Sequence, residues 1–86
     1  MKVPWNIKIV TLAVTKHFSL DYLRKWGWDF HDLRHAITNA YKIDKIGKSK
    51  YEIYIRQSGY KKIISVYYDL EKKLLCITGS QGGKRK

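Results

Sequence analysis

Apolar and polar residues alternate along residues 50–80, which is typical of β-strands with one buried face. A turn at residues 58–59 is expected to place Arg56 opposite Lys61. A second turn over residues 69–72 is expected to fold a third strand back on the second. The second turn pairs Ile64 with Ile77 and Val66 with Leu75. The pattern therefore predicts a three-stranded antiparallel meander.

The expected register gives the sheet one apolar face and one polar, basic face, because side chains alternate across a strand. The apolar face consists of Tyr51, Ile53, Ile55, Ile64, Val66, Leu75 and Ile77. The polar face consists of Lys50, Glu52, Tyr54, Arg56, Lys61, Ser65, Tyr67, Cys76 and Thr78. A face rich in Lys, Arg and Tyr suits contact with a phosphate backbone.

Residues 6–15 are rich in β-branched side chains and apolar on both faces, which predicts a strand covered on both sides. A helix over the same residues is the alternative. Ser19 is expected to cap a helix over residues 20–26 that ends at Gly27. The buried stripe of this helix is expected to be Leu20, Leu23 and Trp26.

Asp29 is expected to cap a second helix over residues 30–41. Its apolar positions at helical spacing are Phe30, Leu33, Ile37, Ala40 and Tyr41. Residues 42–48 are expected to form a short strand or an extended connector.

The fold class predicted from these elements is α+β. Two N-terminal helices are expected to pack on one face of a mostly antiparallel sheet of three to five strands. Residues 1–79 are expected to form a single domain. Residues 80–86 are expected to form a mobile basic C-terminal tail, because two glycines and three terminal charges offer nothing to bury.

The charge of the chain narrows its expected partners. Its 86 residues include 18 Lys and Arg but only 7 Asp and Glu, a formal net charge of +11. This excess favours an anionic partner, which could be a nucleic acid, an acidic protein or a membrane surface. RNA is the preferred expectation, and no cofactor is expected.

Cysteine content and hydropathy exclude several classes of protein. The single cysteine, Cys76, excludes an intramolecular disulfide and a zinc site with four cysteine ligands. The apolar run over residues 7–14 is interrupted by Lys8 and is too short to span a bilayer. We therefore expect no membrane contact and a cytoplasmic location.

The polar face contains residue types that metal-free RNA cleavage requires. A base must take the 2′ proton, an acid must protonate the leaving oxygen, and a cation must stabilise the charge on phosphorus. Arg56 and Lys61 are candidates for a phosphate clamp, and Glu52 is a candidate base. Tyr54 or Tyr67 would position the reacting groups or donate a proton. The alternative is a solvated face on which Glu52 pairs with Lys50 and the tyrosines cover hydrocarbon.

Three further features bear on function. His17 precedes the first predicted helix, and histidine is suited to proton transfer near neutral pH; the alternative is an ordinary surface histidine. His31 and His35 are four residues apart, a spacing at which two imidazoles on a helix could bind the same metal ion. The preferred interpretation is that they lie on a solvated flank of the helix. The terminal Lys84, Arg85 and Lys86 are expected to add non-specific electrostatic affinity for nucleic acid.

Short matches spread over residues 16–79 resemble a known family. They are His17, the sequence Arg-Lys-Trp-Gly at 24–27, Gly47-Lys48 with Tyr51, Val66-Tyr67-Tyr68, and Ile77-Thr78. Together with the order of elements, they resemble the RelE-like toxin superfamily of small basic ribonucleases, and in particular its BrnT-like branch.

The resemblance implies metal-independent cleavage of mRNA and a cognate acidic antitoxin protein that masks the basic face. It also implies functional roles for His17, Arg24, Arg56 and Tyr67. The catalytic candidates are therefore Glu52, Arg56, Tyr67 and His17. The candidates for nucleic-acid binding are Arg24, Lys50, Tyr54, Arg56, Lys61, Lys84, Arg85 and Lys86.

Three functions are compatible with these observations. The first is a toxin-type endoribonuclease. The second is a non-catalytic nucleic-acid-binding module that uses the basic, tyrosine-rich sheet face. The third is a protein-interaction module that docks an acidic partner on the same face.

Overall fold

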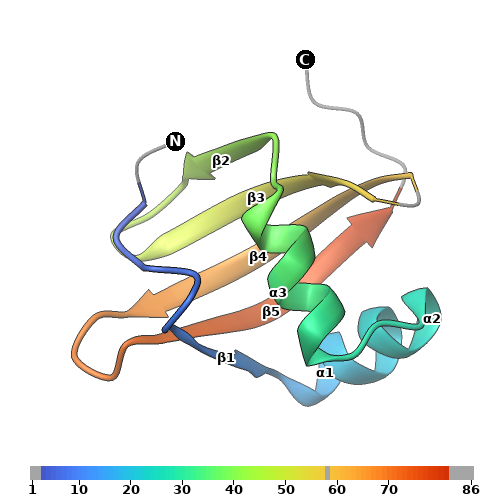
Figure 1. The fold of residues 1–86 in the computed structure, drawn as a ribbon, viewed down its shortest axis with the longest axis horizontal. Helices are drawn as coiled ribbons and strands as arrows, with labels where there is room; N and C mark the ends of the chain where they lie inside the picture. Colours follow the sequence, from blue (N-terminus) through green and yellow to red (C-terminus); the bar gives the residue numbers. More distant parts are fainter. Residues whose placement is uncertain (1–2, 58, 82–86) are drawn as a thin grey trace.

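A five-stranded mixed sheet forms the centre of the molecule (Figure 1). The computed structural model describes residues 3–57 and 59–81. The strands are β1 (Thr11–Val14), β2 (Lys42–Lys45), β3 (Lys50–Arg56), β4 (Tyr60–Tyr68) and β5 (Lys73–Gln81), in the order β1-β5-β4-β3-β2. The helical elements are α1 (Lys16–Phe18), η1 (Ser19–Leu23), α2 (Arg24–Trp26) and α3 (Phe30–Thr38). The α+β class is confirmed.

The N-terminal strand is shorter and more exposed than predicted. Residues 6–10 form turns in which the Ile9 and Val10 amides donate to the Asn6 carbonyl. Within residues 6–15, only β1 is an extended strand. It lies at the edge of the sheet, parallel to β5. Leu12 faces the core, whereas Ala13 is only half-buried. The expectation of a strand covered on both sides was therefore wrong.

The first helical segment begins earlier than predicted. The N-cap is Thr15 rather than Ser19, and its hydroxyl accepts from the Phe18 amide at 3.1 Å. The segment runs through α1, a turn of π-helix (η1) and α2. It ends where predicted, at Gly27, whose φ of +71° favours glycine. The earlier start makes Phe18 a core residue and leaves Leu20 exposed.

Helix α3 confirms the predicted cap at Asp29. The Asp29 carboxylate accepts from the Asp32 amide at 2.8 Å, and the Asp32 carboxylate accepts from the Asp29 amide at 3.1 Å. This bond from the Asp32 backbone lowers the pKa of Asp29. The helix ends at Thr38, shorter than expected, and buries Leu33, Ala36 and Ile37.

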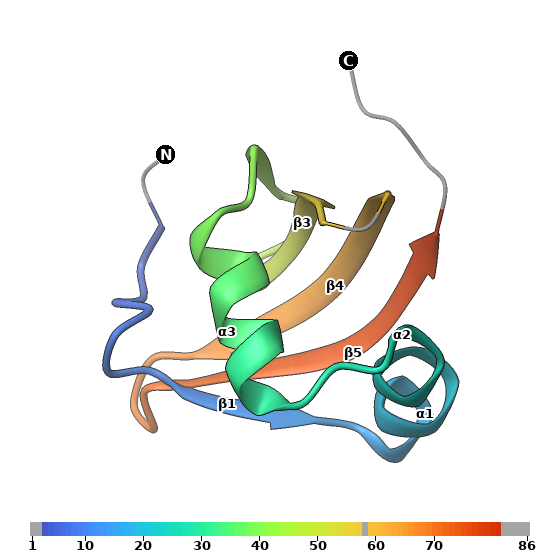
Figure 2. The same ribbon diagram turned by 45° about the vertical axis from the view of Figure 1, so that its right-hand side comes forward.

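The placement of the two helical segments differs from the expectation of two N-terminal helices packed together on one face. Both segments follow β1, in the order that the sequence predicted. Helix α3 crosses the face of the sheet, while α1, η1 and α2 lie apart from it and pack against β5 (Figure 2). None of the described helices is long and apolar enough to cross a membrane.

The predicted register between β3 and β4 was wrong by one residue. Arg56 pairs with Tyr60 rather than Lys61, and Ile53 pairs with Ile63 rather than Ile64. A shift of one residue turns every side chain of β4 to the other face. As a result, Lys61, Ile63, Ser65 and Tyr67 are buried on the side of α3, whereas Ile64 lies on the opposite face.

The pairing of β4 with β5 was predicted correctly at one end only. Val66 pairs with Leu75 as expected, but Ile64 pairs with Thr78 instead of Ile77. A register shift at Ile64 and Ser65 accounts for the difference, since a bulge adds one residue to β5. Strand β5 then continues through Gln81, past the predicted domain end. Residues 82–86 lie outside the described residues.

Cys76 is expected to resist thiol reagents in the folded protein. Its side chain is fully buried, and burial raises the pKa of the thiol from 9.0 to about 11. Because the thiolate is the reacting form, this shift alone should slow labelling about 100-fold relative to the unfolded chain. Labelling with a chromogenic disulfide at about pH 8, with and without denaturant, measures the ratio. Equal rates in the two conditions would contradict the buried position.

Candidate functional site

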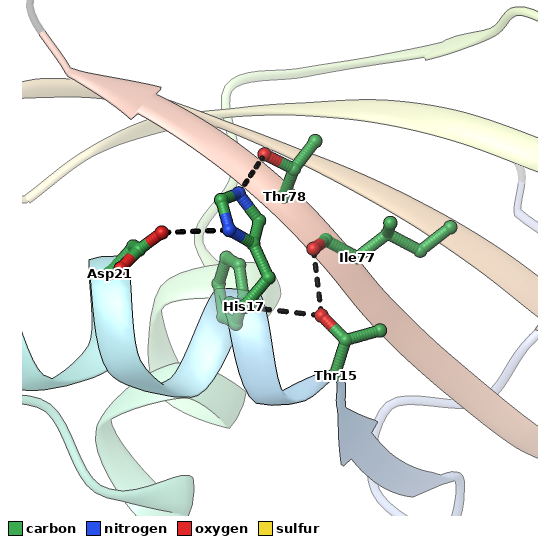
Figure 3. Close-up of polar contacts among 6 residues, drawn as sticks. Thr15, His17, Asp21, Ile77 and Thr78 are labelled. Carbon is green, nitrogen blue, oxygen red and sulfur yellow. Dashed lines mark hydrogen bonds and ion pairs between the residues drawn. The ribbon is translucent and has the colours of Figure 1, made fainter.

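His17 lies at the edge of the sheet between a carboxylate and a hydroxyl (Figure 3). Its Nδ1 is 2.7 Å from Oδ2 of Asp21. Its Nε2 is 3.2 Å from Oγ1 of Thr78. The three side chains come from α1, η1 and β5, so the group joins the first helical segment to the last strand.

Backbone geometry holds these side chains in place. The Thr15 amide donates to the Cys76 carbonyl at 3.0 Å, and the Thr15 hydroxyl donates to the Ile77 carbonyl at 2.8 Å. Thr15 thereby fixes the start of α1 beside β5, one residue before Thr78. Asp21 is contributed by the turn of π-helix, a feature often found at functional sites.

The hydrogen bonds favour one tautomer of His17. A carboxylate can only accept, so the nitrogen beside Asp21, Nδ1, carries hydrogen. In the neutral ring Nε2 then has the lone pair and accepts from the Thr78 hydroxyl. A histidine oriented in this way by a carboxylate is able to take a proton at Nε2.

The site is open to a large ligand. The side chains of His17 and Asp21 are 55% and 57% exposed. One wall is aromatic: the Tyr22 ring meets the imidazole edge to face, with centroids 5.6 Å apart. Tyr22 in turn contacts Phe18 and Trp26 in the packed part of the helix. An open imidazole on a rigid helix suits a polymer rather than an enclosed small molecule.

The other predicted catalytic residues do not gather around His17. Tyr67 is buried on the side of α3, with its ring 5.7 Å from that of Trp5. Glu52 lies on the opposite face, where it accepts from the Tyr54 hydroxyl at 2.8 Å. Arg56 is exposed at the end of β3. The one-residue shift in register therefore separates Tyr67 from Glu52 and Arg56.

The predicted nucleic-acid-binding residues are divided between surface and interior. Arg24 and Lys50 are exposed, at the beginnings of α2 and β3. Tyr54 is largely buried, although it lies on the face away from α3. Lys84, Arg85 and Lys86 lie outside the described residues.

Lys61 is not the exposed half of a phosphate clamp, because its side chain is only 2% exposed. Its Nζ lies 5.5 Å from the rings of both Trp26 and Trp28 and donates to the Gln57 carbonyl at 2.7 Å. Attraction between a cation and two indole rings stabilises a charge placed there. Lys61 thus connects the β3–β4 turn to the end of the first helical segment.

The buried position of Lys61 predicts a specific dependence of stability on pH. Burial lowers the pKa of Lys61 from its ordinary 10.5, so the unfolded chain binds this proton more tightly than the folded protein. The free energy of unfolding of the wild type, minus that of Lys61→Met, should therefore rise from about pH 7 toward pH 10.5. Urea titrations at several pH values measure it. Both proteins contain Cys76, so its titration cancels. A difference that falls with pH would oppose this assignment.

Two members of the His17 group were not identified as site residues from the sequence. Asp21 follows His17 by four residues, the spacing at which side chains meet on a helix, so this pair could have been found. Thr78 was placed on the predicted polar face and within the Ile77-Thr78 match, but it was not assigned a role. Its position beside His17 depends on the bulge in β5.

The histidine pair on α3 lacks further metal-ligand side chains nearby. Across residues 3–57 and 59–81, the structure has no group of three or more His, Cys, Asp or Glu side chains arranged to hold a metal ion. His35 instead approaches Asn39, and its Nε2 lies 3.4 Å from the side-chain Nδ2 of Asn39.

Comparison with known proteins identifies no relative of this chain. No family model matches this chain, and no curated protein or solved structure matches it. The class defined by the fold is an α+β domain with a five-stranded mixed sheet. This chain combines that fold with a high positive charge and a His–Asp–Thr group at the sheet edge.

Proposed function

We propose that this protein binds RNA and cleaves it without a metal, as a toxin-type endoribonuclease of the RelE-like kind. The observation that carries the proposal is the orientation of His17. Asp21 holds Nδ1, and Nε2 is directed at a hydroxyl group on an exposed edge of a strongly basic protein. A 2′-hydroxyl of RNA in the place of the Thr78 hydroxyl would meet the same lone pair.

The proposed reaction is an internal transfer of the phosphoryl group. Nε2 of His17 takes the 2′ proton, and the 2′ oxygen attacks the adjacent phosphorus. The bond to the 5′ oxygen breaks, that oxygen takes a proton from water, and a 2′,3′-cyclic phosphate forms. Arg24, exposed on the same helical segment, is proposed to stabilise the charge on the phosphate.

The proposal is tested with a long unstructured RNA incubated with the protein and excess chelator. Shortened products that carry 2′,3′-cyclic phosphate ends are expected. RNA that stays intact after long incubation would reject the enzymatic function. An acidic antitoxin protein is the proposed partner in the cell, and its addition should stop the cleavage.

A non-catalytic nucleic-acid-binding module is the second candidate. It is favoured by Lys50 and Arg56, which are both exposed and lie at the two ends of β3. This candidate predicts binding that weakens with added salt, while the RNA remains uncut.

A further inference from the structure

Three tyrosines and an arginine form a connected group at the β2 side of the sheet. The rings of Tyr41 and Tyr54 lie 6.3 Å apart, and those of Tyr41 and Tyr60 lie 6.0 Å apart, edge to face. The guanidinium carbon of Arg56 is 5.5 Å from the centre of the Tyr60 ring. We call Tyr41, Tyr54, Tyr60 and Arg56 the tyrosine cluster.

The register places this cluster on the face of the sheet away from α3. Tyr54 pairs with Lys62, and Arg56 pairs with Tyr60. The intervening Ile55 and its partner Lys61 are buried on the side of α3, so their neighbours point the other way. Tyr41 joins the cluster from the position just before β2, where its amide donates to the Tyr54 carbonyl at 3.0 Å.

The members of the cluster differ in how much they are exposed. Tyr54 is buried beneath the others, and its hydroxyl donates to Glu52 at 2.8 Å. Tyr41 is 38% exposed, Tyr60 is partly buried and Arg56 is exposed. Tyr54 therefore supports the cluster, while two rings and a guanidinium group are accessible from solvent.

The charges beside the cluster are mixed. Lys62 lies 3.4 Å from the Glu52 carboxylate, and Lys42 lies 3.9 Å from that of Asp44. Two lysine charges are thus partly balanced by carboxylates. Attraction to phosphate is weaker here than on a purely basic surface, so contact with the rings must supply much of the affinity.

We propose that the tyrosine cluster binds unpaired bases of single-stranded RNA by stacking. Exposed tyrosine rings and a guanidinium plane offer flat surfaces to bases, and this mode of binding tolerates any sequence. Paired bases in a duplex keep their faces stacked on one another and cannot use such a surface. The inference rests on RNA as the ligand in the proposed function, and it specifies the strand form.

Binding of a labelled 12-nucleotide RNA, single-stranded or in a duplex, tests this inference by fluorescence anisotropy at constant salt. Tyr41→Ala should weaken binding of the single strand about fivefold to a hundredfold and leave duplex binding unchanged. Tyr41→Phe, which keeps the ring, should bind like the wild type. The matched control is Tyr68→Ala, since Tyr68 is 40% exposed and also lies beside a cation, Lys73.

A second measurement does not depend on the variants. A 2-aminopurine base in the single strand should lose fluorescence when the wild-type protein binds, because stacking on an aromatic ring quenches it. Unquenched 2-aminopurine at every position would overturn the inference. So would equal effects of Tyr41→Ala and Tyr68→Ala on the single strand, or equal losses by Tyr41→Ala for both strand forms.

Cleavage of long RNA, measured separately, distinguishes the two proposals. Cleavage by the wild type together with unaltered binding by Tyr41→Ala would reject the stacking site and retain the enzymatic function. Stacking-dependent binding without cleavage would reject the enzymatic function and retain the stacking site.

Discussion

Replacement of His17 by glutamine is expected to slow RNA cleavage about 10²- to 10⁴-fold, the usual contribution of a general base. Glutamine is similar in size and can still hydrogen-bond, but it cannot take the 2′ proton. The measurement is the initial rate of cleavage of a long RNA in the presence of a chelator. His35→Gln is the matched control, because His35 is also exposed but lies on α3.

Two further variants separate the roles within the His17 group. Asp21→Asn should also slow cleavage, because it removes the carboxylate that holds Nδ1 at 2.7 Å. Thr78→Val should leave most of the cleavage intact, since the proposal uses the Thr78 hydroxyl only as an occupant of the 2′-hydroxyl position. If His17→Gln cleaved as fast as His35→Gln, the base would have to be another group.

Phe18→Ala is expected to lower the free energy of unfolding by about 3–5 kcal/mol. The Phe18 side chain is fully buried, and its ring contacts those of Tyr22 and Trp26. Gly79 leaves room for it: a Cβ added at Gly79 would lie 3.4 Å from the Phe18 ring. Removal of the ring would leave a cavity between the first helical segment and β5.

Urea denaturation measures this effect, with Leu20→Ala as the control. Leu20 is a large apolar residue on the same helical segment, but it is 49% exposed, so its loss should have a much smaller effect. A domain of this size has only about 5–15 kcal/mol of stability, so Phe18→Ala should remove a large part of it. Similar effects of the two substitutions would show that Phe18 does not anchor the segment.

Local signals in the sequence were sufficient for several elements. Asp29 caps α3 because its side-chain oxygen accepts a hydrogen bond from the Asp32 amide, three residues later, which has no partner within the helix. The Asp32 side chain accepts from the Asp29 amide in return and completes the capping box. Gly27 ends the first helical segment because a left-handed conformation favours glycine there. These features depend on neighbours within a few residues, so they are visible without tertiary structure.

The register of β3 and β4 could not be predicted in the same way. Both alternating sets of β4 contain apolar side chains, with Ile63 and Tyr67 in one and Ile64 and Val66 in the other. The pattern of apolar residues alone therefore favours neither register. The set that is buried includes Lys61, an unexpected interior residue, because Trp26 and Trp28 from a distant part of the chain enclose its ammonium group.

The candidate site was accessible from the sequence only in part. His17 was identified as a candidate, but its partners Asp21 and Thr78 were not. Thr78 lies 61 residues away along the chain, and a bulge in β5 decides which residue meets the imidazole. The RelE-like resemblance and the RNA-cleaving activity it implies remain predictions.

Composition and local pattern thus determined the α+β class, the positive charge, the cap of α3 and the end of the first helical segment. Tertiary structure decided which side chains share a face. The reason is that alternation along a strand has a period of two residues, so one residue in a turn or bulge exchanges the two faces. That choice is made by packing between distant segments, such as Lys61 between two tryptophans, and no local signal encodes it.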